Sequence, residues 1–146
     1  MRATAVAGKL GGKRTLRREI TSEIDLAEAV RAGFPSAVLD HLLDDLAGWV
    51  ESQADVYRVV GSARTLQRKR THRLALSADE SDRLARLARL LVRAEEALGD
   101  DDVAHRWLTR PNRALGGRAP LSLLDSDAGA LAVERVLGRI EHGVHS

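Results

Sequence analysis

The chain has 146 residues, which suits one ordinary domain or two small helical modules and excludes a large multidomain protein. Its 44% hydrophobic residues can form a core, and the aromatic content of only 3% leaves that core to Leu, Val and Ala, which favours helices over an all-β fold. The absence of Cys excludes disulfides, thiolate zinc sites and Cys nucleophiles, and with no apolar stretch typical of a membrane span or secretory signal we expect a cytoplasmic protein.

The formal net charge of +2 hides an uneven distribution of charge along the chain. Residues 1–18 carry six basic and no acidic groups, and residues 61–76 carry five basic and no acidic groups. A local excess of Lys and Arg is typical of segments that bind phosphate backbones, so both segments are candidates for contact with nucleic acid. Because residues 1–18 combine this charge with Gly and Thr and lack a clear apolar period, we predict a flexible basic arm there.

Helices are expected throughout residues 19–75, where apolar side chains recur at helical spacing. Gly33 is suited to end the first helix and Pro35 to begin the second, which continues to Leu46. A third helix is predicted from about Gln53 to Val60. A fourth, capped by Ser62, would extend to about Thr71. The sequence therefore predicts an all-α protein.

The last two of these helices, with Gly61 in the turn between them, have the outline of a helix-turn-helix whose second helix enters the major groove. Tyr57 occupies a position where this motif usually has a small residue. The side chains expected to contact phosphates and base edges are Arg64, Thr65, Arg68, Lys69, Arg70 and Arg73. The alternative interpretation is a solvated basic face that binds nothing.

A second helical module is predicted from Ser77 onward. Ser77 and Glu80 have the spacing of a capping box, in which each side chain accepts a hydrogen bond from the other residue's backbone. The helix that they begin should continue to Leu98 and end at Gly99. Its arginines, Arg86, Arg89 and Arg93, could form a binding stripe, but a solvated face is the commoner explanation for such a pattern, so we do not assign them to a site.

The run Asp100-Asp101-Asp102 precedes a short helix that contains Trp107. Acidic residues at a helix N-terminus complement the helix dipole, and the alternating oxygen ligands of a cation-binding loop are missing, so we do not predict a metal site. A last helix, capped by Asp125 or Ser126, is expected to continue to about Glu141.

Catalytic and cofactor motifs are missing from the sequence. The His residues lack metal-ligand spacing apart from the pair His142 and His145 on the tail, and no Gly-x-Ser-x-Gly elbow occurs. No nucleophile, base and orienting group can be assigned together. We therefore expect a binding protein without a cofactor or metal, not an enzyme.

One extended pattern in residues 76–144 resembles the toxin-binding domain of the Xre/ParS-type antitoxins. The pattern comprises Leu76-Ser77-x-x-Glu80-Ser81-x-Arg83-Leu84, Ala104-x-x-Trp107-Leu108-x-x-Pro111-Asn112-x-Ala114-Leu115-Gly116-Gly117-x-x-Pro120-Leu121-x-Leu123-Leu124, Gly129 and Leu137-Gly138-Arg139-Ile140-x-x-Gly143. The upstream segment Arg64-Thr65-Leu66-x-Arg68-Lys69 fits the same family less strictly. Only the basic segment 1–18 lies outside the resemblance.

The resemblance implies an antitoxin encoded beside a RES-domain toxin that degrades NAD. In such pairs the C-terminal domain dimerises the antitoxin and holds the toxin, the final helix and tail cover the toxin's active site, and the N-terminal domain represses the operon. The covering residues would be Arg139, His142, Gly143 and Val144. Trp107 to Leu115 would shape the domain.

These expectations divide the chain into a flexible arm at 1–18, a helix-turn-helix DNA-binding domain at 19–75 and a toxin-binding and dimerisation domain at 76–146. The expected partners are a RES-domain toxin, operator DNA and a second copy of the chain, without a membrane. The alternative is a stand-alone transcriptional regulator whose C-terminal domain only dimerises.

Overall fold

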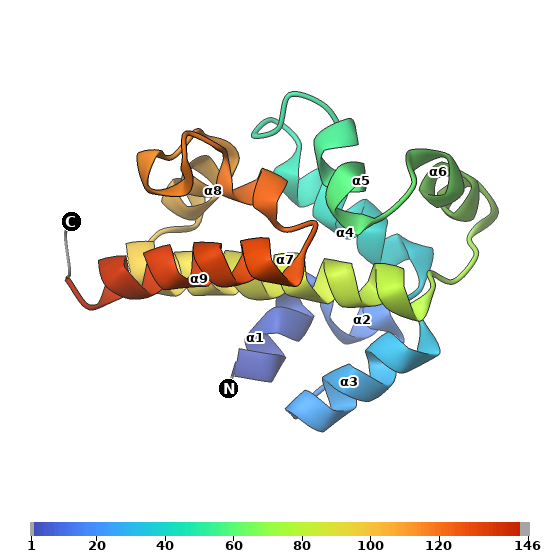
Figure 1. The fold of residues 1–146 in the computed structure, drawn as a ribbon. Coiled ribbons are helices and arrows are strands. Elements are labelled where there is room, and N and C mark those ends of the chain that lie inside the picture. Colours follow the sequence, from blue (N-terminus) through green and yellow to red (C-terminus); the bar gives the residue numbers. More distant parts are fainter. Residues whose placement is uncertain (1, 144–146) are drawn as a thin grey trace.

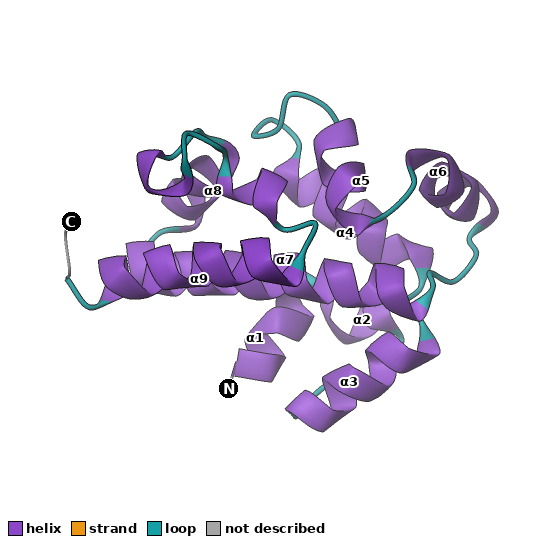
Figure 2. Ribbon diagram, viewed as in Figure 1, coloured by secondary structure: helices purple, strands orange, loops and turns teal. Residues whose placement is uncertain are grey.

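The computed structural model describes residues 2–143, and within this range it contains helices and no β-strand (Figure 2). The elements are α1 (Arg2–Lys9), α2 (Gly12–Leu16), α3 (Glu23–Ala32), α4 (Ser36–Leu46), α5 (Ala54–Val60), α6 (Ala63–His72), α7 (Ala78–Leu98), α8 (Asp101–Thr109), the 3₁₀ turns η1 (Arg113–Leu115) and η2 (Pro120–Leu123), and α9 (Asp127–Glu141). The prediction of an all-α fold is confirmed. None of the helices described is both long and apolar enough to cross a membrane.

Serine side chains begin the helices that the sequence pattern predicts. Ser62 caps α6, Ser77 caps α7 and Ser126 caps α9, each by accepting a hydrogen bond from a backbone N–H in the first turn of its helix. The predicted capping box is present, since Glu80 accepts from the backbone N–H of Ser77 at 2.8 Å. Loss of such a cap costs about 1 kcal/mol, so these residues fix where the helices start.

The long helix α7 is the centre of the fold (Figure 1). It packs against α1, α3 and α5 on the N-terminal side and against α8 and α9 on the C-terminal side, with α9 lying along it. Leu84, Leu87 and Leu91 of α7 are fully buried in a core built mostly from Leu, Val and Ala. The core is therefore continuous across the expected domain boundary at 75/76.

The prediction of a flexible arm at 1–18 is wrong, because this segment folds into α1 and α2 against the core. Ala3, Val6, Ala7 and Leu10 lie at helical spacing on one face and are each at most 6% exposed. Burial of Leu10 alone stabilises the fold by about 1.5–3 kcal/mol. The basic residues of the segment are thus held at fixed places on the surface.

A polar cluster fastens α1 to the C-terminal half. Lys9 of α1 forms ion pairs with Glu95 of α7 and, at 3.1 Å, with Asp101 of α8. His105 of α8 is 1% exposed, with Nε2 2.9 Å from Asp45 Oδ2 and Nδ1 2.7 Å from the backbone oxygen of Asp101. Burial disfavours both cations, but the hydrogen bonds to these oxygens outweigh it and raise the pKa of Lys9 and of His105.

Candidate binding surfaces

The helix-turn-helix predicted from the sequence is present as α5, a turn at Gly61 and α6. Leu66 of α6 is fully buried and Tyr57 of α5 is 3% exposed, so both anchor the motif to the core. The Tyr57 hydroxyl accepts a hydrogen bond from Arg70, which uses the large side chain at this position to connect the two helices. The motif therefore tolerates Tyr57 by giving it a structural contact.

Three of the six predicted nucleic-acid contacts are exposed. Arg64 lies in the first turn of α6, Arg68 lies one turn later and Arg73 follows the end of the helix. Thr65 is half-buried, and its backbone N–H donates to the Ser62 hydroxyl oxygen at 3.4 Å. These exposed guanidinium groups are available for hydrogen bonds to base edges or phosphates.

The other two predicted contacts, Lys69 and Arg70, turn toward the protein instead. The Nζ atom of Lys69 lies 2.6 Å from Glu80 Oε1, with the Lys69 side chain 15% exposed. Arg70 donates to Asp40 and to Tyr57. Burial disfavours the carboxylate of Glu80, but the hydrogen bonds from Lys69 and from the backbone of Ser77 outweigh it and lower the pKa of Glu80. Both cations therefore hold α6 in position, and the sequence interpretation that placed them on the outer face needs this correction.

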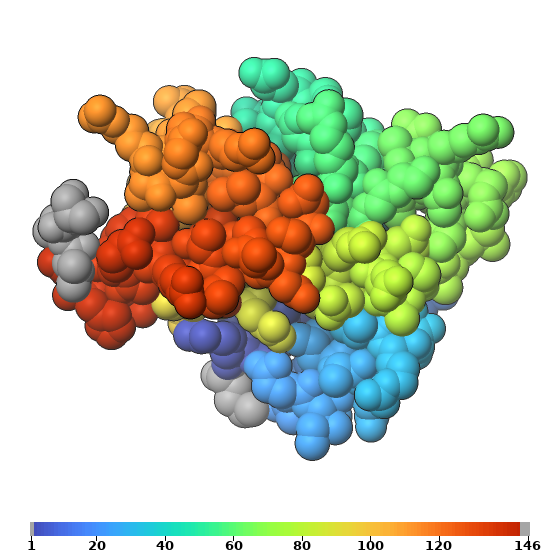
Figure 3. All heavy atoms as spheres, in the orientation of Figure 1, coloured from blue at the N-terminus to red at the C-terminus, as the bar shows by residue number. Residues whose placement is uncertain are grey.

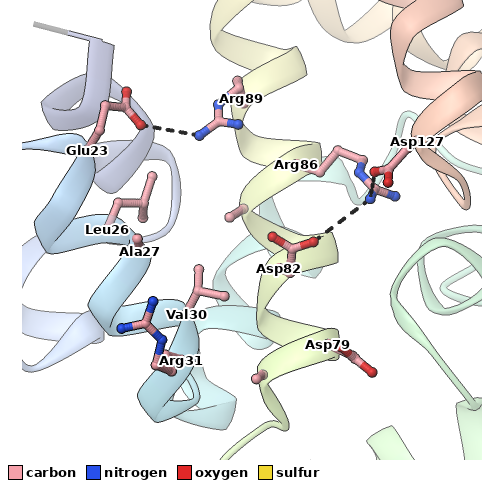
Figure 4. A pocket seen from close by; sticks show the side chains of 12 residues that line it. Glu23, Leu26, Ala27, Val30, Arg31, Asp79, Asp82, Arg86, Arg89 and Asp127 are labelled. Atoms are coloured by element: carbon pink, nitrogen blue, oxygen red, sulfur yellow. Dashed lines mark hydrogen bonds and ion pairs between the residues drawn. The ribbon is translucent and has the colours of Figure 1, made fainter.

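The arginine stripe of α7 is likewise used within the protein. Two of its members, Arg86 and Arg89, line a surface groove of about 500 Å³ between α3 and α7 (Figure 4). Arg89 pairs with Glu23 of α3 at 3.4 Å, and Arg86 pairs with Asp127 at the start of α9. Further along α7, Arg93 pairs with Glu141 at the end of α9 at 2.7 Å. The stripe is neither a solvated face nor a ligand site, since its members connect α7 to its neighbours.

The predicted C-terminal contact residues lie at the end of α9. Arg139, His142 and Gly143 are exposed, whereas Val144 lies outside the described residues. The opposite face of α9 is buried through Val133 and Leu137. In Figure 3 the end of α9 is red and lies beside the orange surface of residues 101–125. A partner protein could therefore contact the end of α9 without displacing its buried face.

Helix α8 and the loop region between α8 and α9 shape this end of the molecule. Trp107 and Leu115 are partly buried and pack against the core, as expected for residues that shape the domain. Asn112 caps the turn η1 and forms an isolated bridge with Arg118. Within Arg2–Gly143, no group of three or more His, Asp or Glu side chains is placed to hold a metal ion.

Sequence reasoning did not predict the position of Arg17. This exposed residue follows α2 and lines the same surface depression as Arg73, which follows α6. Its positive charge was evident from the sequence, but its position depends on the folding of α1 and α2. The available signal was the spacing of Ala3, Val6, Ala7 and Leu10, which matches one face of a helix.

Two family descriptions match consecutive parts of the chain. The Xre-like helix-turn-helix domain of antitoxins matches residues 25–89, and the C-terminal toxin-binding domain of the Xre/MbcA/ParS antitoxins matches residues 93–143. A protein of Yersinia enterocolitica named Antitoxin Xre is 37% identical over 125 residues, which cover 83% of this chain and 81% of that protein. The chain belongs to the Xre family of antitoxins.

Other relatives of this Xre-family antitoxin extend the comparison. An Antitoxin Xre of Photorhabdus laumondii is 36% identical over 129 residues, covering 78% of this chain and 87% of that protein. A Sphingobium protein named Prs ADP-ribosylating antitoxin is 33% identical over 88 residues, about half of each chain. The two matched domains meet within α7, and α1 and α2 precede both. The family resemblance predicted from residues 76–144 is thereby confirmed.

Proposed function

We propose that this Xre-family antitoxin neutralises a RES-domain toxin that degrades NAD, and that it represses its own operon through α6. The C-terminal end of α9 and the tail would cover the active site of the toxin, and the antitoxin would act in the cytoplasm as a homodimer. The toxin class and the mode of inhibition rest on the resemblance of residues 76–144 to antitoxins of RES-type pairs.

The exposed end of α9 is the observation that carries this proposal. Val133 and Leu137 anchor the inner face of the helix, while Arg139 and His142 on its last turns remain exposed. The ion pair between Arg93 and Glu141 holds the end of α9 in place, and the hydrogen bond from Arg93 lowers the pKa of Glu141. A preorganised helix end loses little conformational entropy when it enters a cleft.

Shortening this end should weaken inhibition of the toxin. We expect removal of residues 140–146 to abolish neutralisation, and Arg139→Ala to weaken toxin binding about tenfold, as for the loss of a central interface arginine. Inhibition of NAD loss by the toxin encoded beside this antitoxin would measure both effects. Arg106→Ala, at an exposed position on α8, is the matched control and should bind as the wild type does.

Full neutralisation by the truncated chain would contradict the occlusion mechanism. NAD loss alone does not separate the toxin classes, so the same reactions are also assayed for ADP-ribose on protein, of which an enzyme that only degrades NAD would leave none. Transfer of ADP-ribose to a protein would instead assign the partner to an ADP-ribosylating class, which the name of the Sphingobium relative mentions.

Loss of single exposed arginines on α6 should weaken binding to operator DNA. We expect Arg64→Ala and Arg68→Ala each to reduce the binding free energy by about 1–3 kcal/mol if the side chain reads a base. Fluorescence anisotropy with the DNA upstream of the gene would measure the affinity at fixed salt. Unchanged affinity in both variants would leave α6 as a solvated basic face.

A stand-alone transcriptional regulator is the competing function. It predicts operator binding by the full chain but no complex with the product of the neighbouring gene. Co-purification of the two proteins from cells that express both genes decides between these functions, since a stable complex supports the antitoxin and its absence supports the regulator.

A further inference from the structure

Two arginines adopt a backbone conformation that normally favours glycine. Arg17 has φ +61° and Arg73 has φ +54°, and among residues 2–143 these are the non-glycine residues with positive φ. Each follows the last turn of a helix, Arg17 after α2 and Arg73 after α6, at the position where glycine usually ends a helix. Strain of this kind indicates a role for the side chain that glycine would not provide.

Both arginines line the same surface depression, which has a volume of about 620 Å³. The end of α2, the start of α4 and the end of α6 surround it, so segments far apart in the sequence meet there. Ser36 and Thr71 also lie in its lining, but the Thr71 hydroxyl donates to the backbone oxygen of Gln67 at 2.9 Å. The guanidinium groups of Arg17 and Arg73 are therefore the hydrogen-bond donors that suit an anionic oxygen here.

The charge around this depression is predominantly positive. Its lining contains three arginines, Arg17, Arg70 and Arg73, and one acidic residue. The acidic residue of the lining, Asp40, is paired with Arg70, which compensates its charge. Residues from both purely basic segments of the sequence, Arg17 from the first and Arg73 from the second, thus line the same depression.

We propose that Arg17 and Arg73 together bind a phosphate of the DNA backbone beside the groove that α6 enters. This inference rests on the proposed DNA-binding function and adds the N-terminal helices to it. Arg73 ends α6 itself, so the depression adjoins the helix that would lie in the major groove, whose edges are lined by phosphates. Arginine forks pair bidentately with phosphate, and such contacts fix the position of a protein on the duplex.

Replacement of each arginine by glycine separates binding from stability. Arg17→Gly and Arg73→Gly remove the charge but favour the observed backbone, so Tm should stay equal to or above that of the wild type. At about 0.1 M salt we expect each variant to bind DNA about five- to tenfold more weakly. The slope of log K against log salt should fall in magnitude by about 0.9 for each phosphate that the variant no longer neutralises.

The experiment compares two duplexes of equal length, one with the sequence upstream of the gene and one with a random sequence. A backbone contact predicts the same loss of affinity for both duplexes in each glycine variant. Arg106→Ala, which removes an exposed positive charge on α8, is the matched control and should leave both affinities unchanged.

Unchanged affinity and salt slope in Arg17→Gly and Arg73→Gly, with normal binding by the wild type, would overturn this inference and leave the proposed function intact. A loss confined to the upstream sequence would also overturn it, because that result would assign base reading to these arginines. Failure of the wild type to bind either duplex would instead overturn the proposed DNA-binding function and the inference with it.

Discussion

Replacing Gly129 with Ala should destabilise the folded chain by about 3 kcal/mol or more. Gly129 lies in the first turn of α9, against the turn η2 that ends at Leu123. A Cβ atom at position 129 would lie 1.8 Å from the backbone oxygen of Leu123. Because that atom belongs to the backbone, η2 and α9 must separate to make room. We expect thermal unfolding to show a fall in Tm of about 10 °C and toxin binding to weaken with it.

The matched control is Gly138→Ala on the same helix. A Cβ atom at position 138 would meet only Arg93 Nη2, at 3.8 Å. Alanine favours the helix interior over glycine by up to about 1 kcal/mol, so this variant should be slightly more stable than the wild type. If Gly129→Ala and Gly138→Ala unfold at the same temperature, the close approach of η2 to α9 cannot be the reason for glycine at position 129.

The helices from α3 to α9 were predictable because their signals are local. Ser62 stands directly before the short basic helix α6 and Ser77 before the apolar stripe of α7, and each provides the cap that the pattern predicts. Of the two caps weighed for α9, the structure selects Ser126. Capping depends on residues within one turn, so the sequence alone contains the information.

The roles of individual cations were less predictable, because they depend on which helices meet. Lys69 and Arg64 have the same character in the sequence, yet Lys69 faces Glu80 and Arg64 is exposed. The pairing of Lys69 depends on the packing of α6 against α4 and α5, which brings Lys69 to Glu80 at the start of α7 and which no local pattern specifies. The folding of residues 1–18 was missed for a different reason. The small Ala side chains and the Gly of α1 weaken its apolar signal in the sequence.

The stability of the antitoxin should also depend on pH through His105. Both ring nitrogens face oxygen acceptors, Nδ1 at 2.7 Å from the backbone oxygen of Asp101 and Nε2 at 2.9 Å from Asp45 Oδ2. A neutral imidazole carries only one N–H. The ring nitrogen without a hydrogen would then be an acceptor facing an acceptor oxygen, with no hydrogen between them. The geometry therefore favours the imidazolium, in agreement with the raised pKa of His105. Around it lie the carboxylates of Asp45 and Asp101, and Asp101 in turn contacts Lys9.

The direction of the pH effect follows from the raised pKa of His105. In the unfolded chain the imidazole titrates near its ordinary pKa of 6.5, whereas the folded chain holds the proton to higher pH. The stabilisation is complete below the unfolded pKa and is lost as the pH rises through the folded value. Each unit by which the pKa is raised corresponds to about 1.4 kcal/mol. Denaturant unfolding of the wild type should therefore show lower stability at alkaline than at mildly acidic pH.

Asp45→Asn tests this assignment because it removes the carboxylate that His105 Nε2 contacts. Hydrogen bonds to charged groups contribute about 1.5–3 kcal/mol, so the variant should lose about that much stability at mildly acidic pH and show a flatter pH profile. His41→Gln, at an exposed position on the same helix α4, is the control and should keep the profile of the wild type. If Asp45→Asn retains the full pH dependence, another group must titrate. If it flattens the profile, the pair joins α4 to α8 and couples the helix-turn-helix half of the core to the toxin-binding half.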